Sequence, residues 1–337
     1  MSFSDKYSYD EIRAGPADLD KFLSLKAKEG IELMFCIVPD SGPSYAMVKQ
    51  SAELRCGVLT QCIKAGTVYR KRNDGSTISN ILLKVNAKMN GTNHKLQQTP
   101  VLNGKCMVIG ADVTHPSPDQ SRIPSVVGVA ASHDIYAFQY NICWRLQGPR
   151  QEMIEDFEEI ICSQLNFYKE KNKVFPESIL YFRDGVSEGQ FQEVMNRELT
   201  AMYRAIQKCC GNPKAIKVAF VVVQKRHHTR FFPGRSGVGK DDRRNNNVPA
   251  GTIVDTQITH PNETHFYLVS HQSIQGVAKP TKYCVLSDDL NMSIDDLQTL
   301  TYNLCHLFTR CNRSVSYPAP TYYAHLAAYR GRVYLEG

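Results

Sequence analysis

Two aspartates follow apolar runs, at positions where a carboxylate could do chemistry. Asp112 follows CMVI within CMVIGADVTHPSPDQ (residues 106–120), and Asp184 follows the run SILYF with one Arg between (residues 178–182). A lone Asp at a strand end is most often a turn residue, and this alternative stays open for each position. Two acids at neighbouring strand ends repel unless a cation lies between them, and Mg²⁺ or Mn²⁺ prefers oxygen ligands. The pair predicts a divalent-metal site suited to phosphodiester hydrolysis.

A histidine near the end of the sequence is the third candidate ligand. Pro318 and Pro320 predict a helix that starts close to them and carries His325 in its first turns. A neutral imidazole commonly binds a metal beside carboxylates. The alternative is a core histidine that only makes hydrogen bonds, and His325 taken alone does not decide between the two.

These residues require a fold that brings strand ends together. Apolar patterns predict strands at residues 105–112, 125–132 and 137–146, a helix at 150–168, a strand at 178–183, a helix capped by Ser187, and a strand at 218–223. Three meander strands followed by helix, strand, helix and strand is the order of the ribonuclease H-like fold, an α/β architecture with a mixed sheet covered by helices. In that order the first and fourth strands are central neighbours, which places Asp112 beside Asp184.

The first hundred residues predict a smaller domain. Residues 30–38 form a strand candidate, a turn rich in Pro and Gly follows, and a helix is expected from about residue 44. A second helix is expected from residue 79 or 80 to residue 89, before a polar linker at residues 90–100. We place the domain boundary near residue 98.

Composition indicates a folded protein with a modest basic excess. The 337 residues are 42% hydrophobic, and 40 Lys and Arg against 33 Asp and Glu give a net charge of +7. This balance favours a polyanionic partner without proving one. The sequence shows no secretory leader and no apolar stretch of membrane-spanning length. Eleven scattered cysteines without a C-x-x-C pair predict buried free thiols in a reducing compartment, consistent with a soluble, cytoplasmic protein.

Five ordered motifs resemble the Piwi domain of the Argonaute family. They are GADVTHP (110–116), YFRDGVSEGQF (181–191), VQKRHHTRFF (223–232), NVPAGTIVDTQITHP (247–261) and RSVSYPAPTYYAHLAAYRGR (313–332). The resemblance covers essentially the whole chain. It implies that residues 1–98 are a partial, Rossmann-like Mid domain and that residues 99–337 are a ribonuclease H-like Piwi domain. The stretches SVVGVAASHD (125–134) and RGRVYL (330–335) are most similar to the siRNA-class Argonautes of arthropods.

The resemblance implies a catalytic tetrad. By motif match its members are Asp112, Glu152, Asp184 and His325, with Asp112, Asp184 and His325 as ligands of Mg²⁺ or, as the alternative ion, Mn²⁺. On the sequence alone Glu152 is an ordinary exposed residue near a helix start, where a negative charge suits the helix dipole. Its assignment therefore depends on the family.

The resemblance also implies a pocket for the 5′ phosphate of a guide RNA. The matching residues are Tyr45, Lys49, Gln61, Lys84, Lys88 and Arg330. Spacing agrees for two pairs, because Tyr45 and Lys49, like Lys84 and Lys88, are four residues apart on predicted helices and can converge on one anion. Solvated lysine faces are the alternative. Residues that resemble those following the guide backbone are His271, Lys279, Arg310, Arg313, Ser316 and Tyr322, and such contacts fix position without reading sequence.

The function implied by the resemblance is that of a small-RNA-guided endoribonuclease in RNA interference and antiviral defence. Its partners would be a small guide RNA (siRNA or miRNA), a complementary target RNA, and RISC-loading and silencing proteins, with no membrane. The alternatives are a guide-binding silencing module that does not cleave and a truncated, inactive fragment. The sequence departs from a complete Argonaute: we find no N-terminal or PAZ domain, no first part of the Mid domain, and no C-terminal tail. Anchoring of the guide 3′ end is therefore not expected, and the 5′-phosphate pocket is expected to be weaker.

Two other motifs do not support a function. GRSGVGKD (234–241) approaches a Walker A loop, but Asp241 replaces the required Ser or Thr and a polar loop follows in place of a helix. His227 and His228 have no second ligand pair at the spacing of a zinc site, so we assign no metal there.

Overall fold

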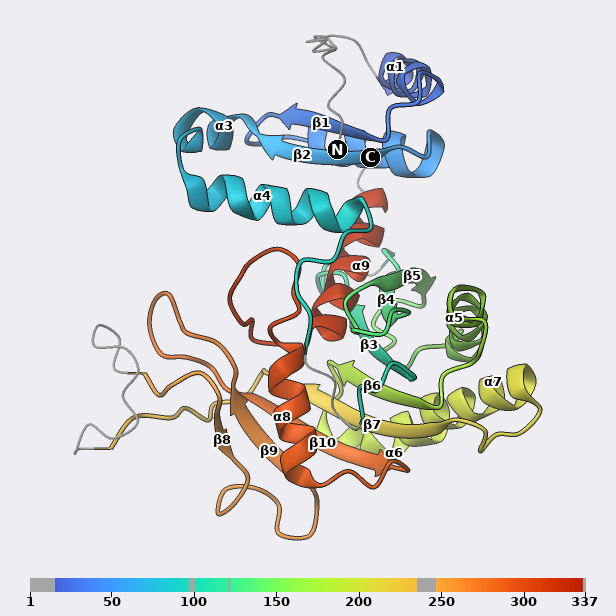
Figure 1. Ribbon diagram of the computed structural model, residues 1–337, viewed down its shortest axis with the longest axis vertical. Helices are drawn as coiled ribbons and strands as arrows, with labels where there is room; N and C mark the ends of the chain where they lie inside the picture. Colours follow the sequence, from blue (N-terminus) through green and yellow to red (C-terminus); the bar gives the residue numbers. More distant parts are fainter. Residues whose placement is uncertain (1–15, 97–100, 121, 235–246, 336–337) are drawn as a thin grey trace. The chain divides into compact units, whose positions relative to one another are not determined.

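The computed structural model describes residues 16–96, 101–120, 122–234 and 247–335 (Figure 1). The chain forms two compact units. The first holds the described residues up to Ser79 together with those from Arg332 onward, and the second holds the described residues from Asn80 to Gly331. The domain boundary predicted near residue 98 lies outside the described residues, so the division at that point stays a prediction.

The first unit is built around two parallel strands. Its elements are α1 (Pro16–Lys28), β1 (Leu33–Val38), α2 (Ser44–Lys49), the π-helix η1 (Gln50–Arg55), β2 (Leu59–Lys64), α3 (Ala65–Lys71) and the start of α4 (Gly75–Lys88). β1 pairs with β2 in parallel, with Leu33 opposite Leu59. Parallel strands need a crossover connection, which α2 and η1 supply here. This β-α-β arrangement agrees with the predicted Rossmann-like character.

The second unit contains the remaining elements. They are β3 (Cys106–Thr114), β4 (Ser125–Ser132), β5 (Tyr140–Gln147), α5 (Phe157–Asn172), β6 (Ser178–Asp184), the 3-10 helix η2 (Glu188–Gln190), α6 (Phe191–Val194), the π-helix η3 (Met195–Leu199), α7 (Thr200–Cys210), β7 (Lys217–Gln224), β8 (Thr252–Val254), β9 (His265–Val269), β10 (Thr281–Asp288), α8 (Ile294–Leu304) and α9 (Ala319–Leu335). No helix within the described residues is both long enough and apolar enough to cross a bilayer.

One mixed sheet organises the second unit. Its strand order is β5-β4-β3-β6-β7-β10-β9-β8 (Figure 1). The three strands β3, β4 and β5 form an antiparallel meander, whereas β3, β6 and β7 run parallel. β10 then pairs antiparallel with β7 and β9. The α/β fold class and the central pairing of the first and fourth strands of this unit are therefore confirmed.

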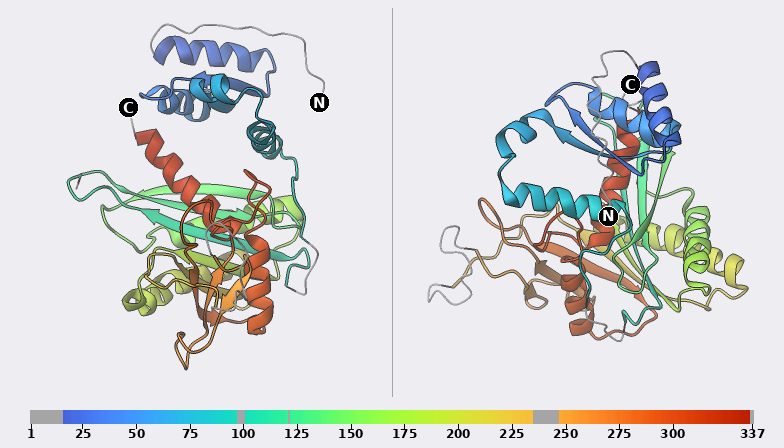
Figure 2. Two further views of the ribbon diagram at one scale, coloured as in Figure 1. Left: turned by 90° about the vertical axis from the view of Figure 1, so that its left-hand side faces the viewer. Right: turned by 45° about the horizontal axis from the view of Figure 1, so that its top comes forward.

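Helices cover both faces of this sheet (Figures 1 and 2). Successive strand residues point to opposite faces, so Met107 and Ile109 of β3 join one core and Val108 joins the other. α5 and α7 pack on the first face, and α8 with the first turns of α9 packs on the second. Because both faces are covered, the central strands are nearly continuous apolar runs, which made them visible in the sequence.

The helix expected at residues 150–168 begins later than predicted. α5 starts at Phe157, and residues 148–156 form a loop in which Arg150 has φ 63°. Met153 and Ile154 match the helical spacing of apolar residues, yet they are buried as part of this loop. The predicted start near Arg150 was wrong, because apolar spacing cannot distinguish a buried loop from a helical face.

Candidate functional site

Asp112 and Asp184 lie side by side at the carboxyl ends of two neighbouring strands. β3 and β6 are parallel, with Ala111 opposite Arg183, so the residues that follow emerge together. The Asp112 and Asp184 side chains are only 12% and 13% exposed. With His325 they form the one group of three within the described residues whose ligand atoms could hold a metal ion, all within 4.8 Å of one another.

Two glycines let α9 approach the sheet closely enough to bring His325 to these acids. A Cβ added to Gly110 of β3 would lie 2.2 Å from the carbonyl oxygen of Pro320. A Cβ added to Gly128 of β4 would lie 2.2 Å from the carbonyl oxygen of Ala324. Only glycine permits such a close approach of two backbones. The predicted helix restart after the prolines is confirmed, and it presents His325 from its first turns.

The imidazole of His325 lies between the two acids. Its Nε2 is 2.6 Å from Asp184 Oδ2 and 3.7 Å from Asp112 Oδ2. Burial alone would lower the pKa of His325, but the hydrogen bond to Asp184 and the charges of both acids raise it above the ordinary value. Burial raises the pKa of Asp112; His325 opposes that rise and Asp184 adds to it. Two hard carboxylate oxygens and one ring nitrogen at this separation fit Mg²⁺ or Mn²⁺.

Glu152 lies in the loop before α5, with its side chain 15% exposed. The expectation of an ordinary exposed residue near a helix start was therefore wrong. Glu152 Oε1 accepts a hydrogen bond from Arg183 Nη1 at 2.8 Å, and His115 Nε2 lies 2.8 Å from its Oε2. A Cβ added to Gly185 would lie 3.1 Å from Glu152 Oε1 and 3.8 Å from Asp112 Oδ1, so the two acids flank the same glycine. The structure thus brings the loop acid to the strand-end acids.

Sequence reasoning missed the residues that hold Glu152. Arg183 is fully buried and pairs with Glu198, which is also fully buried. Burial would lower the pKa of the Arg183 guanidinium, but the charge of Glu198 raises it well above its ordinary value. A signal for Arg183 was present in the quoted YFRDG, because a charged residue inside a buried strand must find a partner. His115 and Glu198 carried no comparable signal.

Three residues predicted to bind the guide 5′ phosphate belong to the first unit. Tyr45 is half-buried on α2, Gln61 is buried on β2, and Lys49 is 2% exposed. Lys49 Nζ donates to Glu53 Oε1 at 3.0 Å and to the Thr60 hydroxyl at 2.7 Å. The ammonium of Lys49 is therefore held by protein atoms here, and its role as a phosphate ligand stays a prediction.

The other three predicted phosphate ligands belong to the second unit. Lys84 and Lys88 are half-buried on α4, four residues apart as expected, and Arg330 is half-buried on α9. Burial and the nearby positive charge of Arg310 lower the pKa of Lys84. Two cations close enough to affect each other form a site where an anion would relieve the repulsion. Arg310, predicted to follow the guide backbone, thus lies near Lys84.

Lys225 joins several residues predicted to follow the guide backbone. Its ammonium donates to the Ser316 hydroxyl and lies 4.6 Å from the centre of the Tyr317 ring. Burial lowers the pKa of Lys225 to about 8, although the negative charge of Asp184 opposes the shift. Burial, together with the Lys225 charge, lowers the pKa of His271 to about 4. Lys225 was missed because a single Lys after a strand has no distinguishing spacing.

The remaining predicted backbone contacts are dispersed. Lys279 is exposed, and its charge contributes to the lowered pKa of Lys225. Arg313 is exposed in the segment before α9, and the centre of the Tyr322 ring lies 6.2 Å from that of His325. Their positions do not show whether these residues bind RNA, so guide-backbone contact stays a prediction for each of them.

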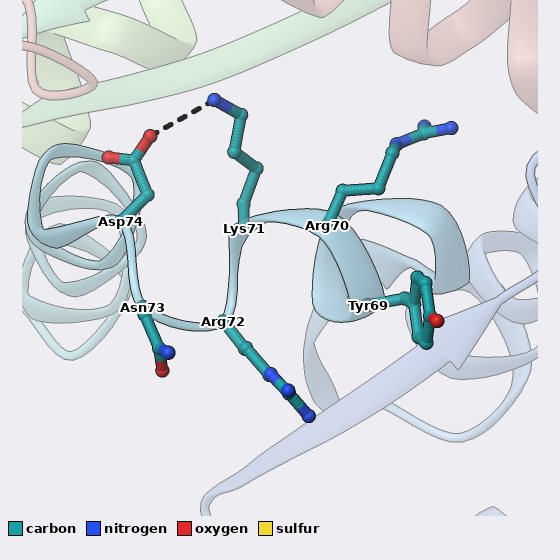
Figure 3. Close-up of a pocket in the computed structure, with 6 residues that line it drawn as sticks. All are labelled: Tyr69, Arg70, Lys71, Arg72, Asn73 and Asp74. Carbon is teal, nitrogen blue, oxygen red and sulfur yellow. Dashed lines mark hydrogen bonds and ion pairs between the residues drawn. The ribbon is translucent and has the colours of Figure 1, made fainter.

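An open hollow in the first unit contains none of the predicted site residues. It is lined by Tyr69, Arg70, Lys71, Arg72, Asn73 and Asp74 (Figure 3). Lys71 Nζ donates to Asp74 Oδ2 at 3.1 Å, while Arg70 and Arg72 extend in different directions (Figure 3). These charges do not converge on one anion, and we assign no site there.

The two discounted motifs have different outcomes. In the Walker-like stretch, residues 235–241 lie outside the described residues. His227 Nε2 lies 3.0 Å from the carbonyl oxygen of Pro280, which gives this ring a backbone partner.

Sequence comparisons point to one family. The family model described as Piwi domain matches residues 33–336, and so spans the predicted boundary near residue 98. Protein argonaute-2 of Drosophila melanogaster is 52% identical over 339 residues, which cover 100% of this chain and 27% of that protein.

Solved structures agree with the sequence comparison. A crystal structure of Kluyveromyces polysporus Argonaute with a guide RNA is 29% identical with a TM-score of 0.85, over 96% of this chain and 40% of that one. The C-terminal lobe of a budding yeast Argonaute is 28% identical with a TM-score of 0.84, over 94% of this chain and 66% of that one. The chain thus spans only part of each relative, and the predicted ribonuclease H-like fold is confirmed.

Proposed function

Because the chain belongs to the Argonaute family and carries its Piwi domain, we propose that it is a small-RNA-guided endoribonuclease. Base pairing with a guide RNA would select the target, and the ribonuclease H-like unit would hydrolyse the target strand. The observation that supports this most directly is the group Asp112, Asp184 and His325, whose ligand atoms lie within 4.8 Å of one another.

The site residues would have two different roles in hydrolysis, metal binding and orientation of the attacking water. Asp112, Asp184 and His325 would hold Mg²⁺, and the chemistry it supplies is a lower pKa for a water and compensation of charge on the leaving oxygen. Arg183 and His115 contact one oxygen each of Glu152 and so fix its direction, and because each carboxylate oxygen has a second lone pair, Glu152 would orient the attacking water by accepting a hydrogen bond. The paired strand ends keep Asp112 and Asp184 in place, so these two acids need little reorganisation during the reaction.

Guide anchoring is the second part of the proposal. In the second unit, relief of the repulsion between Lys84 and Arg310 would favour an anion, which supports these residues as part of a 5′-phosphate site. Lys49 would contribute only after its ammonium turns from Glu53 and Thr60, or by positioning its neighbours. Lys225, Ser316 and His271 would contact the guide backbone, which sets position without reading sequence.

One assay separates the candidate functions. The purified chain is mixed with a 5′-phosphorylated guide and a labelled complementary RNA, in Mg²⁺ or in EDTA. We expect cleavage of the target when both the guide and Mg²⁺ are present, and no cleavage in EDTA or without the guide. Guide binding without cleavage would favour a silencing module that recruits other proteins, and absence of both would identify an inactive fragment.

A further inference from the structure

Glu198 is a buried carboxylate that the proposed chemistry does not use directly. It lies on the π-helix η3 and is fully buried. Its Oε2 accepts a hydrogen bond from Tyr181 Oη at 2.8 Å, and Arg183 Nε donates to both oxygens at 3.1 and 3.2 Å. A buried ion pair is weak support for stability, since apolar residues of similar volume often stabilise a core as well. The presence of Glu198 therefore requires another reason.

The partners of Glu198 connect it to Glu152. The Arg183 guanidinium that binds Glu198 through Nε and Nη2 also donates through Nη1 to Glu152 Oε1 at 2.8 Å. Because a guanidinium is a rigid planar fork, fixing one edge fixes the direction of the other. Arg183 Nη1 also donates to the carbonyl oxygen of Asp184. The guanidinium therefore contacts both Glu152 and the end of β6, which carries the predicted metal ligand Asp184.

Glu198 also holds the loop that carries Glu152. The Ile154 N–H, two residues after Glu152, donates to Glu198 Oε1 at 3.1 Å. This amide is buried and outside any helix, so the side chain supplies the acceptor that regular structure would otherwise provide. One carboxylate therefore fixes both the side chain and the backbone of the Glu152 segment.

Charge balance gives a second reason for this arrangement. If Glu152 were the sole acid beside Arg183, the two would form a closed ion pair with little net charge. Glu198 is fully buried beside Arg183, so it compensates the buried guanidinium charge where solvent does not reach, and Arg183 does not depend on Glu152 alone for an acidic partner. The π-turn adds a residue to the helix and so changes the direction of its side chains, a feature often found at functional sites.

We propose that Glu198 is a positioning residue, which fixes the Glu152 carboxylate beside Asp112 and Asp184 by holding Arg183 and the Ile154 amide. This inference rests on the proposed nuclease function for its consequence but not for its geometry. The first test is therefore made without RNA or metal. Amide hydrogen exchange is compared between Glu198→Gln and the wild-type chain, with Glu193→Gln as the matched control, because Glu193 forms an exposed pair with Arg197 in the same helical segment.

In Glu198→Gln, we expect amide exchange in peptides from residues 148–156 to be faster than in wild type. The acceleration should be about ten times any acceleration measured in β7 peptides of the same variant. A residue that only supports overall stability would accelerate both regions equally, and this result would overturn the proposal. An unchanged loop would overturn it as well. Glu193→Gln should leave both regions as in wild type.

Glu198→Asp keeps the inference testable if the Gln variant does not fold. Aspartate retains the charge that Arg183 needs, but its side chain is one methylene shorter and cannot reach both Arg183 and the Ile154 amide. We expect selective loosening of the 148–156 loop in this variant too. A folded Glu198→Asp protein with a fully protected loop would refute the positioning role.

Cleavage gives the functional readout. With guide and target bound, both Glu198 variants should cleave about tenfold to a hundredfold more slowly, as expected when a reacting group is displaced by about 1 Å, while the affinity for guide and target is unchanged. A wild-type chain that does not cleave would refute the proposed function and leave the exchange result to decide the role of Glu198. Cleavage by the variants at the wild-type rate would refute that role alone.

Discussion

Replacing Asp112 by Asn tests the metal site through stability and activity at once. The substitution keeps the size of the side chain and removes one charge. With Asp112 and Asp184 ligand atoms within 4.8 Å, their repulsion is about 3.5 kcal/mol at an effective dielectric constant of about 20. The attraction between Asp112 and a protonated His325, at 3.7 Å, is about 4.5 kcal/mol on the same basis. The two nearly cancel, so in metal-free buffer the variant should differ from wild type by about 1 kcal/mol while His325 is charged.

The balance changes with pH. The pKa of His325 in the folded protein is raised, so its stabilising interaction is fully present below the unfolded value of about 6.5 and is lost as pH rises through the higher folded value. Above that value the repulsion between the acids is uncompensated. Without metal, Asp112→Asn should then be more stable than wild type, by up to about 3.5 kcal/mol. Melting temperatures at about pH 6 and about pH 9, in EDTA, measure this crossover.

Mg²⁺ should reverse the order of stability. Saturation at about 100 times its Kd stabilises a folded protein by about 2.7 kcal/mol, which raises the melting temperature by a few degrees. Asp112→Asn and Asp184→Asn should lose most of this shift, and cleavage should fall at least about a hundredfold while guide binding is kept. Asp119→Asn, at an exposed loop position, is the matched control. If Mg²⁺ raises the melting temperature of the wild type, both site variants and the control equally, and both site variants still cleave, the predicted metal site is wrong.

Three further predictions address the guide site, the helix seat and a buried histidine. Replacing both Lys84 and Lys88 with Ala should weaken binding of 5′-phosphorylated RNA by roughly 3 kcal/mol, from about 1.5 per charge-assisted contact, whereas equal losses for unphosphorylated RNA would indicate a general basic face. Gly128→Ala should lower stability by about 1–3 kcal/mol and abolish cleavage, because its Cβ would lie 2.2 Å from a backbone oxygen of α9, and Gly189→Ala, in open space, should do neither in the same melting and cleavage assays. Burial lowers the pKa of His271 to about 4, so the unfolded chain binds more protons than the folded one between that value and 6.5. The wild type should therefore lose stability on acidification across that window, and His271→Gln should lose less; equal pH profiles of melting temperature would contradict this.

The strands of the second unit could be predicted because burial on both faces keeps their apolar runs continuous. β4 matches the expected residues 125–132, and β6 extends the expected 178–183 by one residue, to Asp184. Once the strand order was assigned, the pairing of Asp112 with Asp184 followed from topology alone. His325 was located by the prolines that begin its helix.

Other parts of the site had no local signal. The loop that carries Glu152 is lined by Met153 and Ile154, whose spacing imitates a helix. Glu198 lies on a π-turn, where the 3.6-residue period that predicts a helical face does not hold. Spacing placed Lys49 on a helix with Tyr45, but it could not show that the ammonium is buried against Glu53 and Thr60. Tertiary partners decide these positions, and they lie far away in the sequence or off the helical period.

The different origins of the acids explain how the site is built. Asp112 and Asp184 extend from paired strands, and His325 comes from a helix that packs closely on two glycines of the sheet, so backbone geometry brings these three residues together. Glu152 comes from a loop, which has no such constraint. Its position depends on polar contacts with Arg183, and the buried guanidinium is in turn held and compensated by the fully buried Glu198. The network around Glu198 therefore supplies to the loop the rigidity that the sheet supplies to the strand ends.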